Sequence, residues 1–280
     1  MRMVVTGASG FVGTALVPVL RARGHEVSTP ARAALDDPPA LLAGADVLLH
    51  LAALAHARGV GASELRRANV DLPVSLGSAA ARAGVRMLFV STCKVLGEEG
   101  RFTDASPIAP ADAYARSKAE AEAKLRAIPG LALTMLRPPL VYGPGVKANF
   151  LALAAAVARG MPLPLASIDN RRSLLYVGNL ADALARCAES PQAQGRAWLV
   201  SDGVPLSTPA LCRALGDALG RPARLFAFPP ALLELAPAAR KLTRSLELDD
   251  GALRRELGWM PPHGLEEALR QTARWYRARG

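Results

Sequence analysis

The chain has 280 residues, of which 51% are hydrophobic and 21% are charged, and its formal net charge is +10. This length suits one large α/β domain or two unequal lobes, and the composition excludes intrinsic disorder as the main state. The three cysteines, Cys93, Cys187 and Cys212, lack the spacing of metal ligands. We therefore expect no disulfide framework, no metal site and a reducing, cytoplasmic location.

The basic excess consists of 29 arginines and five lysines, which are scattered along the chain. No basic stretch carries the interleaved aromatic residues of a single-strand groove, so we expect small anionic ligands and no nucleic acid as partners. The first six residues run directly into a glycine turn, and the longest apolar stretch, Ala40 to Ala57, is interrupted by polar residues. We expect neither a signal peptide nor a membrane-spanning helix.

The first half of the chain alternates strands with long helices. The predicted strands are residues 2–6, 25–28, 45–51, 86–91 and 131–137, and the predicted helices are residues 11–23, 63–83 and 111–128. This alternation predicts an α/β fold with a Rossmann-type doubly wound parallel sheet. Residues 29–44 hold three prolines, so any strand within them must be minimal.

A proline-rich mixture of short helices and strands follows Pro138. The candidate elements are residues 149–159, 173–177, 180–189, 197–201, 207–219, 229–242 and 265–277. We interpret this part as a smaller mixed α/β lobe laid over the carboxyl ends of the sheet strands, where ligands bind in such folds.

Three glycines follow the first predicted strand, in Gly7-Ala8-Ser9-Gly10-Phe11-Val12-Gly13. Gly7 allows the sharp turn, Gly10 lets the backbone approach a pyrophosphate, and Gly13 lets the helix pack closely on the sheet. The free N–H groups at the helix amino terminus then face the anion. Because the motif lies between a strand and a helix, it predicts a dinucleotide site rather than a plain tight turn.

The residues after the second strand bear on the choice between NAD and NADP. An acidic residue there usually binds the ribose hydroxyls of NAD, whereas an arginine favours the 2′-phosphate of NADP. Here no carboxylate occurs before Asp36, and Arg32 is the candidate phosphate ligand. This pattern favours NADP or dual use, with an ordinary surface role for Arg32 as the alternative.

Tyr114 and Lys118 are four residues apart on a predicted helix and therefore share a face. A nearby ammonium favours phenolate and lowers the pKa of a tyrosine, as a general acid/base near neutral pH requires. Ser91-Thr92-Cys93 ends a strand about twenty residues earlier, where a hydroxyl can bond the same substrate oxygen. Each feature alone is typical of an exposed helical pair or of simple turn chemistry. Their order and spacing together predict that Tyr114 and Lys118 act with a hydroxyl at this strand end.

These motifs resemble the extended short-chain dehydrogenase/reductase superfamily, specifically the NAD-dependent epimerase/dehydratase family of nucleotide-sugar enzymes. The matching segments, which span essentially the whole chain, are Thr6 to Gly13, His50 to Ala53, Ala68 to Val70, Ser91 to Glu98, Tyr114 to Lys118, Arg137 to Lys147, Arg172 to Val177 and Glu256 to Trp259. The resemblance implies NAD or NADP as cofactor. It adds to the three glycines the following contacts: Phe11, Val12, Leu51, Ala52, Ala53, Asn69, Lys118, Pro138, Pro139 and Leu140.

The resemblance also implies a substrate. Arg172 matches the family's arginine that binds a nucleotide diphosphate. Setting Val95-Leu96-Gly97 on the family's Val-Tyr-Gly places Thr92 on the catalytic Ser/Thr, with Tyr114 and Lys118 on the catalytic pair. The resemblance thus implies a catalytic set of Thr92, Tyr114 and Lys118, in which Thr92 and Tyr114 would hold the sugar oxygen. Lys147 and Asn149 are weaker candidates for diphosphate contacts, because ordinary surface polarity explains them equally simply. Residues 1–145 are then the NAD(P)-binding Rossmann domain, and residues 146–280 are mainly the substrate lobe, with about 170–200 returning to the main sheet. Relatives often pair through helices 63–83 and 111–128, which implies a possible homodimer.

Within the family the chain is most similar to polysaccharide-cluster enzymes that act at C4 of a UDP-hexose. We predict reduction of a UDP-4-keto-6-deoxy-N-acetylhexosamine for cell-surface polysaccharide synthesis, with NADP slightly favoured. The alternative is a UDP-glucose or UDP-N-acetylglucosamine 4-epimerase with bound NAD. A reductase of a non-sugar ketone and a non-enzymatic dinucleotide-sensing protein are remoter readings. Three departures from the family pattern bear on this choice: Leu96 replaces a tyrosine, the acidic residue after the second strand is absent, and residues 240–250 lack a second diphosphate clamp.

Overall fold

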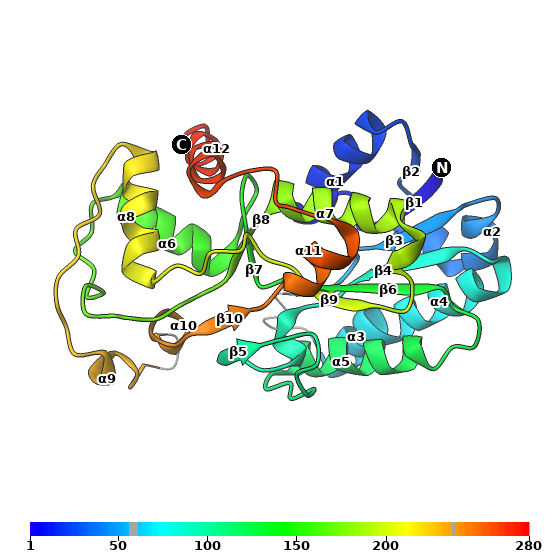
Figure 1. Ribbon diagram of the computed structural model, residues 1–280, viewed down its shortest axis with the longest axis horizontal. Coiled ribbons are helices and arrows are strands. Elements are labelled where there is room, and N and C mark those ends of the chain that lie inside the picture. The colour runs from blue at the N-terminus through cyan, green and yellow to red at the C-terminus, as the bar shows by residue number, and fades with distance from the viewer. Residues whose placement is uncertain (56–60, 237–238, 280) are drawn as a thin grey trace.

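Six strands form the main sheet of the protein, whose computed structural model describes residues 1–55, 61–236 and 239–279 (Figure 1). The strands are β1 (Arg2–Thr6), β2 (Glu26–Ser28), β3 (Val47–His50), β4 (Arg86–Val90), β6 (Leu133–Arg137) and β9 (Ala197–Leu199). Their order is β2-β1-β3-β4-β6-β9, and every neighbouring pair is parallel. All four residues of β3 are buried, as expected for a central parallel strand that is covered on both faces.

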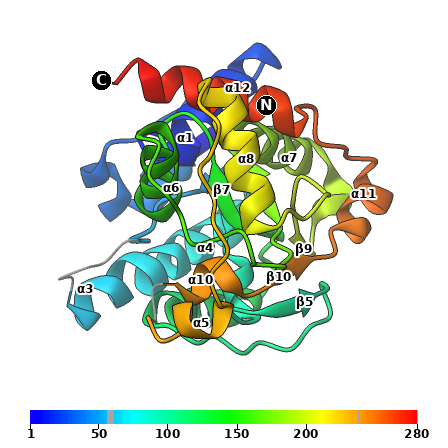
Figure 2. The ribbon, with the colours of Figure 1, turned by 90° about the vertical axis from the view of Figure 1, so that its left-hand side faces the viewer.

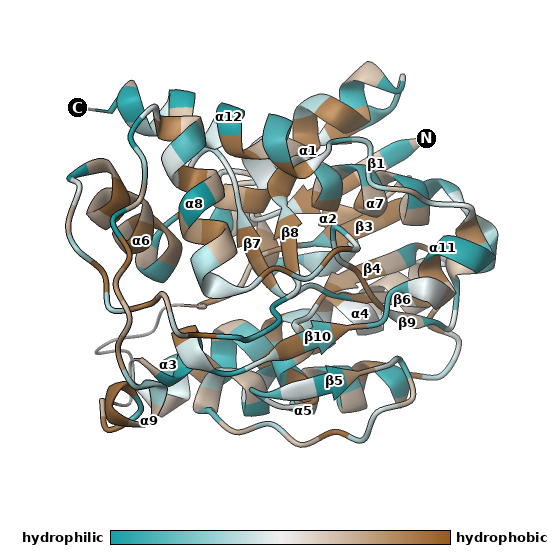
Figure 3. Cartoon of the chain, turned by 60° about the vertical axis from the view of Figure 1, so that its left-hand side comes forward, coloured by the Kyte–Doolittle hydropathy of each residue, from teal (hydrophilic) through white to brown (hydrophobic). Residues whose placement is uncertain are grey.

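Helices cover both faces of this sheet. On one face α1 (Phe11–Ala22) packs against α7 (Val177–Glu189), and α11 (Gly251–Leu257) joins the same hydrophobic core. On the other face lie α2 (Pro38–Leu42), α4 (Leu72–Ala83) and α5 (Ala113–Arg126). Figure 1 shows the two helical layers above and below the strands, and Figure 3 shows the hydrophobic strands between them. The predicted Rossmann-type doubly wound sheet is confirmed.

Two segments of the first half carry details that the sequence pattern did not reveal. Residues 29–44 form a 3-10 helix (Arg32–Asp36) and α2, with no strand between them. The predicted helix at 63–83 consists of α3 (Ala62–Arg66), a π-helical turn (Arg67–Asp71) and α4. A π turn holds one more residue than an α turn and frequently occurs at functional sites. This one contains Asn69.

Three further helices enclose a second hydrophobic core around Tyr142 and Phe150. They are α6 (Ala148–Ala158), α8 (Thr208–Leu219) and α12 (Leu265–Arg277), and α8 packs against both of the others (Figure 2). Two small parallel sheets connect distant parts of the chain. They pair β7 (Leu140–Tyr142) with β8 (Leu174–Tyr176), and β5 (Gly100–Phe102) with β10 (Leu246–Leu248).

The candidate element at residues 229–242 is not one element. The chain forms two four-residue helices there, α9 (Pro230–Leu233) and α10 (Arg240–Thr243). Leu233 and Leu242 pack against the second hydrophobic core, whereas Leu235 is 79% exposed, so the apolar residues do not form one buried face that would sustain a longer helix. Strand β9 lies in the main sheet beside β6. The boundary between two lobes at residue 145 stays a prediction.

Candidate functional site

The glycine turn lies where the strand order of the main sheet reverses, between β1 and β3. In doubly wound sheets this switch point is the place where ligands bind, outside the carboxyl ends of the strands. Gly7 has a φ of +74°, and a Cβ atom on it would stand 2.7 Å from the backbone nitrogen of Ala52. A Cβ atom on Gly13 would stand 2.4 Å from the carbonyl oxygen of Gly7. The turn therefore requires glycine at both positions.

The same turn fits the pyrophosphate of a dinucleotide. Gly10 caps α1 without any side-chain hydrogen bond, so the first N–H groups of the helix have no intrahelical acceptor. Ser9 and Gly10 are exposed, while Phe11 and Val12 are partly buried against the start of the helix. A helix amino terminus with free N–H groups and no side chain in the way binds phosphate oxygens.

The end of β3 is held by His50. Its Nδ1 atom and the Thr6 hydroxyl share a hydrogen bond of 2.8 Å. Burial, followed by the charge of Lys118, lowers the pKa of His50 to about 3, so the ring is neutral. This neutral ring fixes the start of the segment Leu51 to Ala53, whose backbone approaches Gly7.

Asn69 ties that segment to helix α5. Its side-chain oxygen accepts a hydrogen bond from the Leu54 N–H at 2.8 Å, and its amide donates to the Leu54 carbonyl at 3.2 Å and to the Ser117 hydroxyl at 3.0 Å. The Ser117 hydroxyl in turn donates to the carbonyl oxygen of Tyr114 at 2.8 Å. The asparagine is 1% exposed, so it acts within the fold as a support and has little surface left for a ligand.

Thr92 lies in the turn after β4, and its side chain is nearly buried. The Thr92 oxygen accepts a hydrogen bond from the Lys94 N–H at 3.3 Å, which caps a 3-10 helix (Cys93–Val95). Because this contact uses only the acceptor side of the hydroxyl, its proton remains available for a substrate oxygen. The Cys93 N–H donates to the carbonyl of Pro138 at 2.9 Å, which brings the turns after β4 and β6 together.

Tyr114 and Lys118 lie on α5, and the Lys118 nitrogen is 3.8 Å from the centre of the Phe89 ring of β4. Burial lowers the pKa of Lys118 to about 7, against the charge of Glu122. Burial raises the pKa of Tyr114 to about 12, and Asp112 and Cys93 act in the same direction. The expectation that Lys118 lowers the pKa of Tyr114 is not met for these side chains as they lie, because burial of the phenol is the main influence on this pKa.

A buried ion pair that the sequence analysis missed anchors α5. Arg137, at the end of β6, donates two hydrogen bonds to the Glu122 carboxylate, at 3.0 and 2.6 Å. Burial alone would raise the pKa of Glu122, but the hydrogen bonds and charge of Arg137 lower it below its ordinary value. The available signal was a glutamate one helical turn after Lys118, on the face of the helix that the pattern assigns to the core.

The predicted substrate and cofactor contacts differ in how far their side chains are buried. Arg172 is partly buried, and it donates a hydrogen bond to the carbonyl oxygen of Arg244 at 2.8 Å. Burial lowers the pKa of its guanidinium. Lys147 and Asn149 are both exposed at the start of α6. Arg32 is exposed in its 3-10 helix. Of the proline segment, Pro138 is buried beside the Thr92 turn, whereas Leu140 is 42% exposed.

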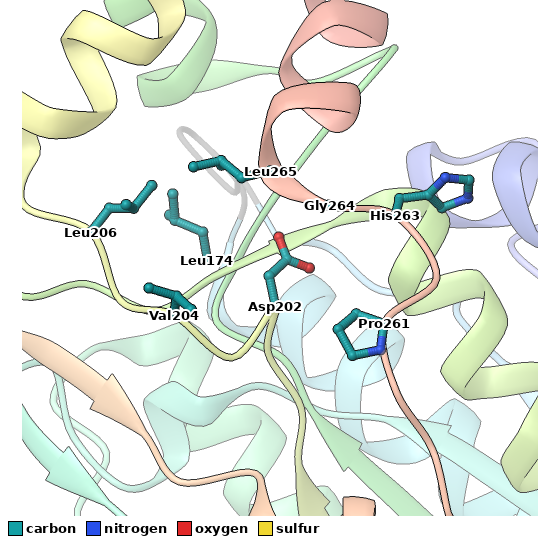
Figure 4. Close-up of a pocket in the computed structure, with 8 residues that line it drawn as sticks. All are labelled: Leu174, Asp202, Val204, Leu206, Pro261, His263, Gly264 and Leu265. Carbon is teal, nitrogen blue, oxygen red and sulfur yellow. The ribbon is translucent and has the colours of Figure 1, made fainter.

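A pocket of about 210 Å³ opens between β8 and the connection that leads into α12 (Figure 4). Leu174, Val204 and Leu206 make much of its lining apolar, and Asp202 points toward the segment of His263 and Gly264. The Asp202 carboxylate already accepts hydrogen bonds from the Tyr176 N–H and the Asn179 amide. Among the described residues, none of the predicted site residues lines this pocket, and we assign no ligand to it.

Within residues 1–55, 61–236 and 239–279, no three His, Cys, Asp or Glu side chains are grouped so that they could hold a metal ion. No helix of these residues is long and apolar enough to cross a membrane. The three cysteines are free and buried.

The fold and the glycine turn are those of a dinucleotide-binding class of enzymes, and sequence comparison identifies the family. The profile of the NAD dependent epimerase/dehydratase family matches residues 3–201, and the chain belongs to this family. The resemblance that the motifs indicated is thereby confirmed, together with NAD or NADP as the family's cofactor.

Individual relatives differ in activity. A UDP-glucose 4-epimerase from Vibrio cholerae is 35% identical, over 97% of this chain and 94% of that protein. A 2-alkyl-3-oxoalkanoate reductase from Stenotrophomonas maltophilia is 31% identical, over 97% of this chain and 98% of that protein. The solved structure of MoeE5 in complex with UDP-glucuronic acid and NAD is 25% identical, with a TM-score of 0.81 and complete coverage of both chains.

Proposed function

We propose that the protein is an NAD-dependent UDP-hexose 4-epimerase that uses Thr92, Tyr114 and Lys118. One observation carries the proposal: the Thr92 turn, which follows β4, contacts the start of α5 and is joined to it by the ion pair of Lys94 with Asp112. The 35% identity to a UDP-glucose 4-epimerase over nearly the whole chain supports the same activity. This is the alternative reading of the sequence; the 4-keto-sugar reductase that we predicted first has less support.

The proposed mechanism divides the work between the cofactor and the chain. A bound nicotinamide supplies reversible hydride transfer at C4 of the sugar. Tyr114 takes up the proton of the C4 hydroxyl as the 4-keto sugar forms, and returns it once the opposite face of the sugar is presented. Thr92 donates a hydrogen bond to the same oxygen. The backbone N–H groups at the start of α1 would bind the pyrophosphate, in a turn that Gly7, Gly10 and Gly13 make possible.

Lys118 supplies the positive charge of this site. It lies one helical turn after Tyr114. Burial raises the pKa of the phenol in the structure described above, so we propose that the ammonium favours the phenolate once substrate and dinucleotide are bound, and that it also binds a ribose. Arg172 is the proposed ligand of the substrate diphosphate, because a guanidinium fork matches phosphate oxygens. Its side chain is partly buried, and its backbone pairs with Leu246, which shares a hydrophobic cluster with Cys93. Lys147 and Asn149 remain proposed diphosphate contacts from the start of α6.

One observation favours an NADPH-dependent reductase as a second candidate. After β2 the chain runs Thr29-Pro30-Ala31-Arg32, so no carboxylate is placed for the ribose hydroxyls of NAD, and the Arg32 side chain is exposed. A reductase is also among the relatives that match nearly the whole chain.

The dinucleotide that the protein retains separates the two candidates. The purified protein is denatured, and the released dinucleotide is identified and quantified against the protein. An epimerase must keep its cofactor between the two hydride transfers, so we expect about one NAD per chain. A protein that is purified empty, and that consumes NADPH with a UDP-4-keto-6-deoxy sugar, would instead be the reductase.

A further inference from the structure

Lys94 bridges the Thr92 turn and the beginning of helix α5. Its ammonium contacts the Asp112 carboxylate closely and lies 2.9 Å from a carboxylate oxygen of Glu98. Burial alone would lower the pKa of Lys94, but its hydrogen bonds to Asp112 and Glu98 raise it, so the side chain is charged. The lysine is thus held from two sides.

Asp112 is the residue that starts α5. One of its carboxylate oxygens accepts a hydrogen bond from the Ala115 N–H at 2.7 Å and caps the helix, while the other receives Lys94. Tyr114 lies two residues further on. Because the same carboxylate binds both the helix and the lysine, the position of the first helical turn depends on the position of Lys94.

The backbone of Lys94 holds the hydroxyl of Thr92. Its N–H donates to the Thr92 oxygen, as described above, and so orients that hydroxyl. One residue therefore binds Thr92 through its backbone and the Tyr114 helix through its side chain. An ion pair on an open surface contributes little to stability, but a pair that spans two elements of one site can fix their separation.

We propose that Lys94 is a positioning residue that sets the separation of the Thr92 and Tyr114 hydroxyls through Asp112; this role rests on the proposed epimerase function. Loss of the ammonium removes neither hydroxyl, but it frees the Thr92 turn to move relative to helix α5. A misplacement of about 1 Å in such a site reduces turnover about 100-fold.

The test uses Lys94→Met, which keeps the aliphatic stem, and Lys94→Arg, which restores a cation. We expect kcat of the methionine variant to fall about 10- to 100-fold with KM for the UDP-hexose nearly unchanged, and the arginine variant to recover most of it. Asp112→Asn keeps a capping oxygen but loses the charge, so it should lower kcat similarly. Combining it with Lys94→Met should add little further loss. The matched control is Lys124→Met, which removes an exposed lysine that pairs with Glu120 on the same helix.

A readout without substrate makes the bridge testable on its own. Cys93 adjoins Lys94 and is 2% exposed, so a thiol reagent should label it slowly in the wild-type protein. Peptide mass mapping should show faster labelling of Cys93 in Lys94→Met, and unchanged labelling in Lys124→Met. If the protein turns over no UDP-hexose, the proposed function fails, yet this labelling still reports on the bridge. Wild-type kcat in Lys94→Met, unchanged Cys93 labelling, a raised KM as the main effect, or no recovery in Lys94→Arg would each overturn the positioning role.

Discussion

Arg137 and Glu122 form an ion pair in which neither side chain is more than 3% exposed. The pair connects the end of β6 to the middle of α5, the helix that carries Tyr114 and Lys118. Removing one partner of a buried pair leaves the other charge without compensation, which destabilises a protein by about 3–5 kcal/mol.

We therefore expect Glu122→Gln to lower the free energy of unfolding by about 3 kcal/mol or more, measured by urea denaturation. Glu120→Gln is the matched control, because Glu120 lies on the same helix and pairs with Arg66 and Lys124 at the surface. We expect that change to stay within about 0.5 kcal/mol. Equal effects of the two substitutions would show that the buried pair does not anchor α5.

Tyr114→Phe removes only the phenolic oxygen. If Tyr114 moves the C4 proton, turnover should fall by at least about 100-fold while the dinucleotide stays bound. Turnover is measured with the UDP-hexose and dinucleotide content by release on denaturation, with Tyr276→Phe as the control because Tyr276 lies on α12, outside the proposed site. Substantial residual turnover in the Tyr114 variant would contradict the role.

The lowered pKa of Lys118 should make the stability of the protein depend on pH. Burial lowers its pKa to about 7, whereas the ordinary value is 10.5. Between these pH values the unfolded chain holds the proton and the folded chain has lost it, so the free energy of unfolding should rise with pH, by at most about 1.4 kcal/mol per unit from this group.

Urea denaturation at several pH values between 7 and 10 measures this slope. Lys118→Met should flatten it relative to the wild type, and Lys124→Met should not, because Lys124 is 43% exposed. A wild-type slope in Lys118→Met would show that the buried lysine titrates at its ordinary pH.

Gly13→Ala tests whether the dinucleotide binds at the glycine turn. The added methyl group would meet Gly7 and Ala8 backbone atoms at 2.4 to 2.5 Å, so we expect loss of bound dinucleotide and a destabilisation of about 1–3 kcal/mol. Gly264→Ala is the control, because no atom lies within 4 Å of the added group and φ is −72°. Unchanged dinucleotide content in Gly13→Ala would argue against binding at this turn.

The sequence predicted the main sheet because its signals are local. A short apolar strand, a glycine turn and an amphipathic helix each occupy neighbouring residues, as at Arg2–Thr6 and Phe11–Ala22. The single candidate element at 229–242 divides into α9 and α10, because continuous apolar residues sustain a longer helix only when a neighbouring surface buries them. Leu235 has no such cover.

The supports of the candidate site were harder to predict because they join residues far apart in sequence. Glu122 and Arg137 are 15 residues apart, Lys94 and Asp112 are 18 apart, and Asn69 reaches Ser117 across 48. No local pattern specifies such partners. The raised pKa of Tyr114 was missed for a related reason: spacing on a helix places Lys118 nearby but does not reveal how strongly the fold desolvates the phenol.

Several expectations stay predictions, among them the homodimer, the cytoplasmic location and the individual substrate contacts. Arg172 is the substrate contact with the most structural support, since it is partly buried and pairs with Leu246, which packs with Cys93. Lys147 and Asn149 are exposed.

Turnover without added cofactor tests the central claim most directly. The purified protein is incubated with UDP-galactose, and separately with UDP-N-acetylglucosamine, and the proton signals of the sugars are followed by NMR. We predict conversion of at least one of them to its C4 epimer, with no added dinucleotide and no net change in NAD. A protein with a full complement of bound NAD that converts neither sugar would contradict the account.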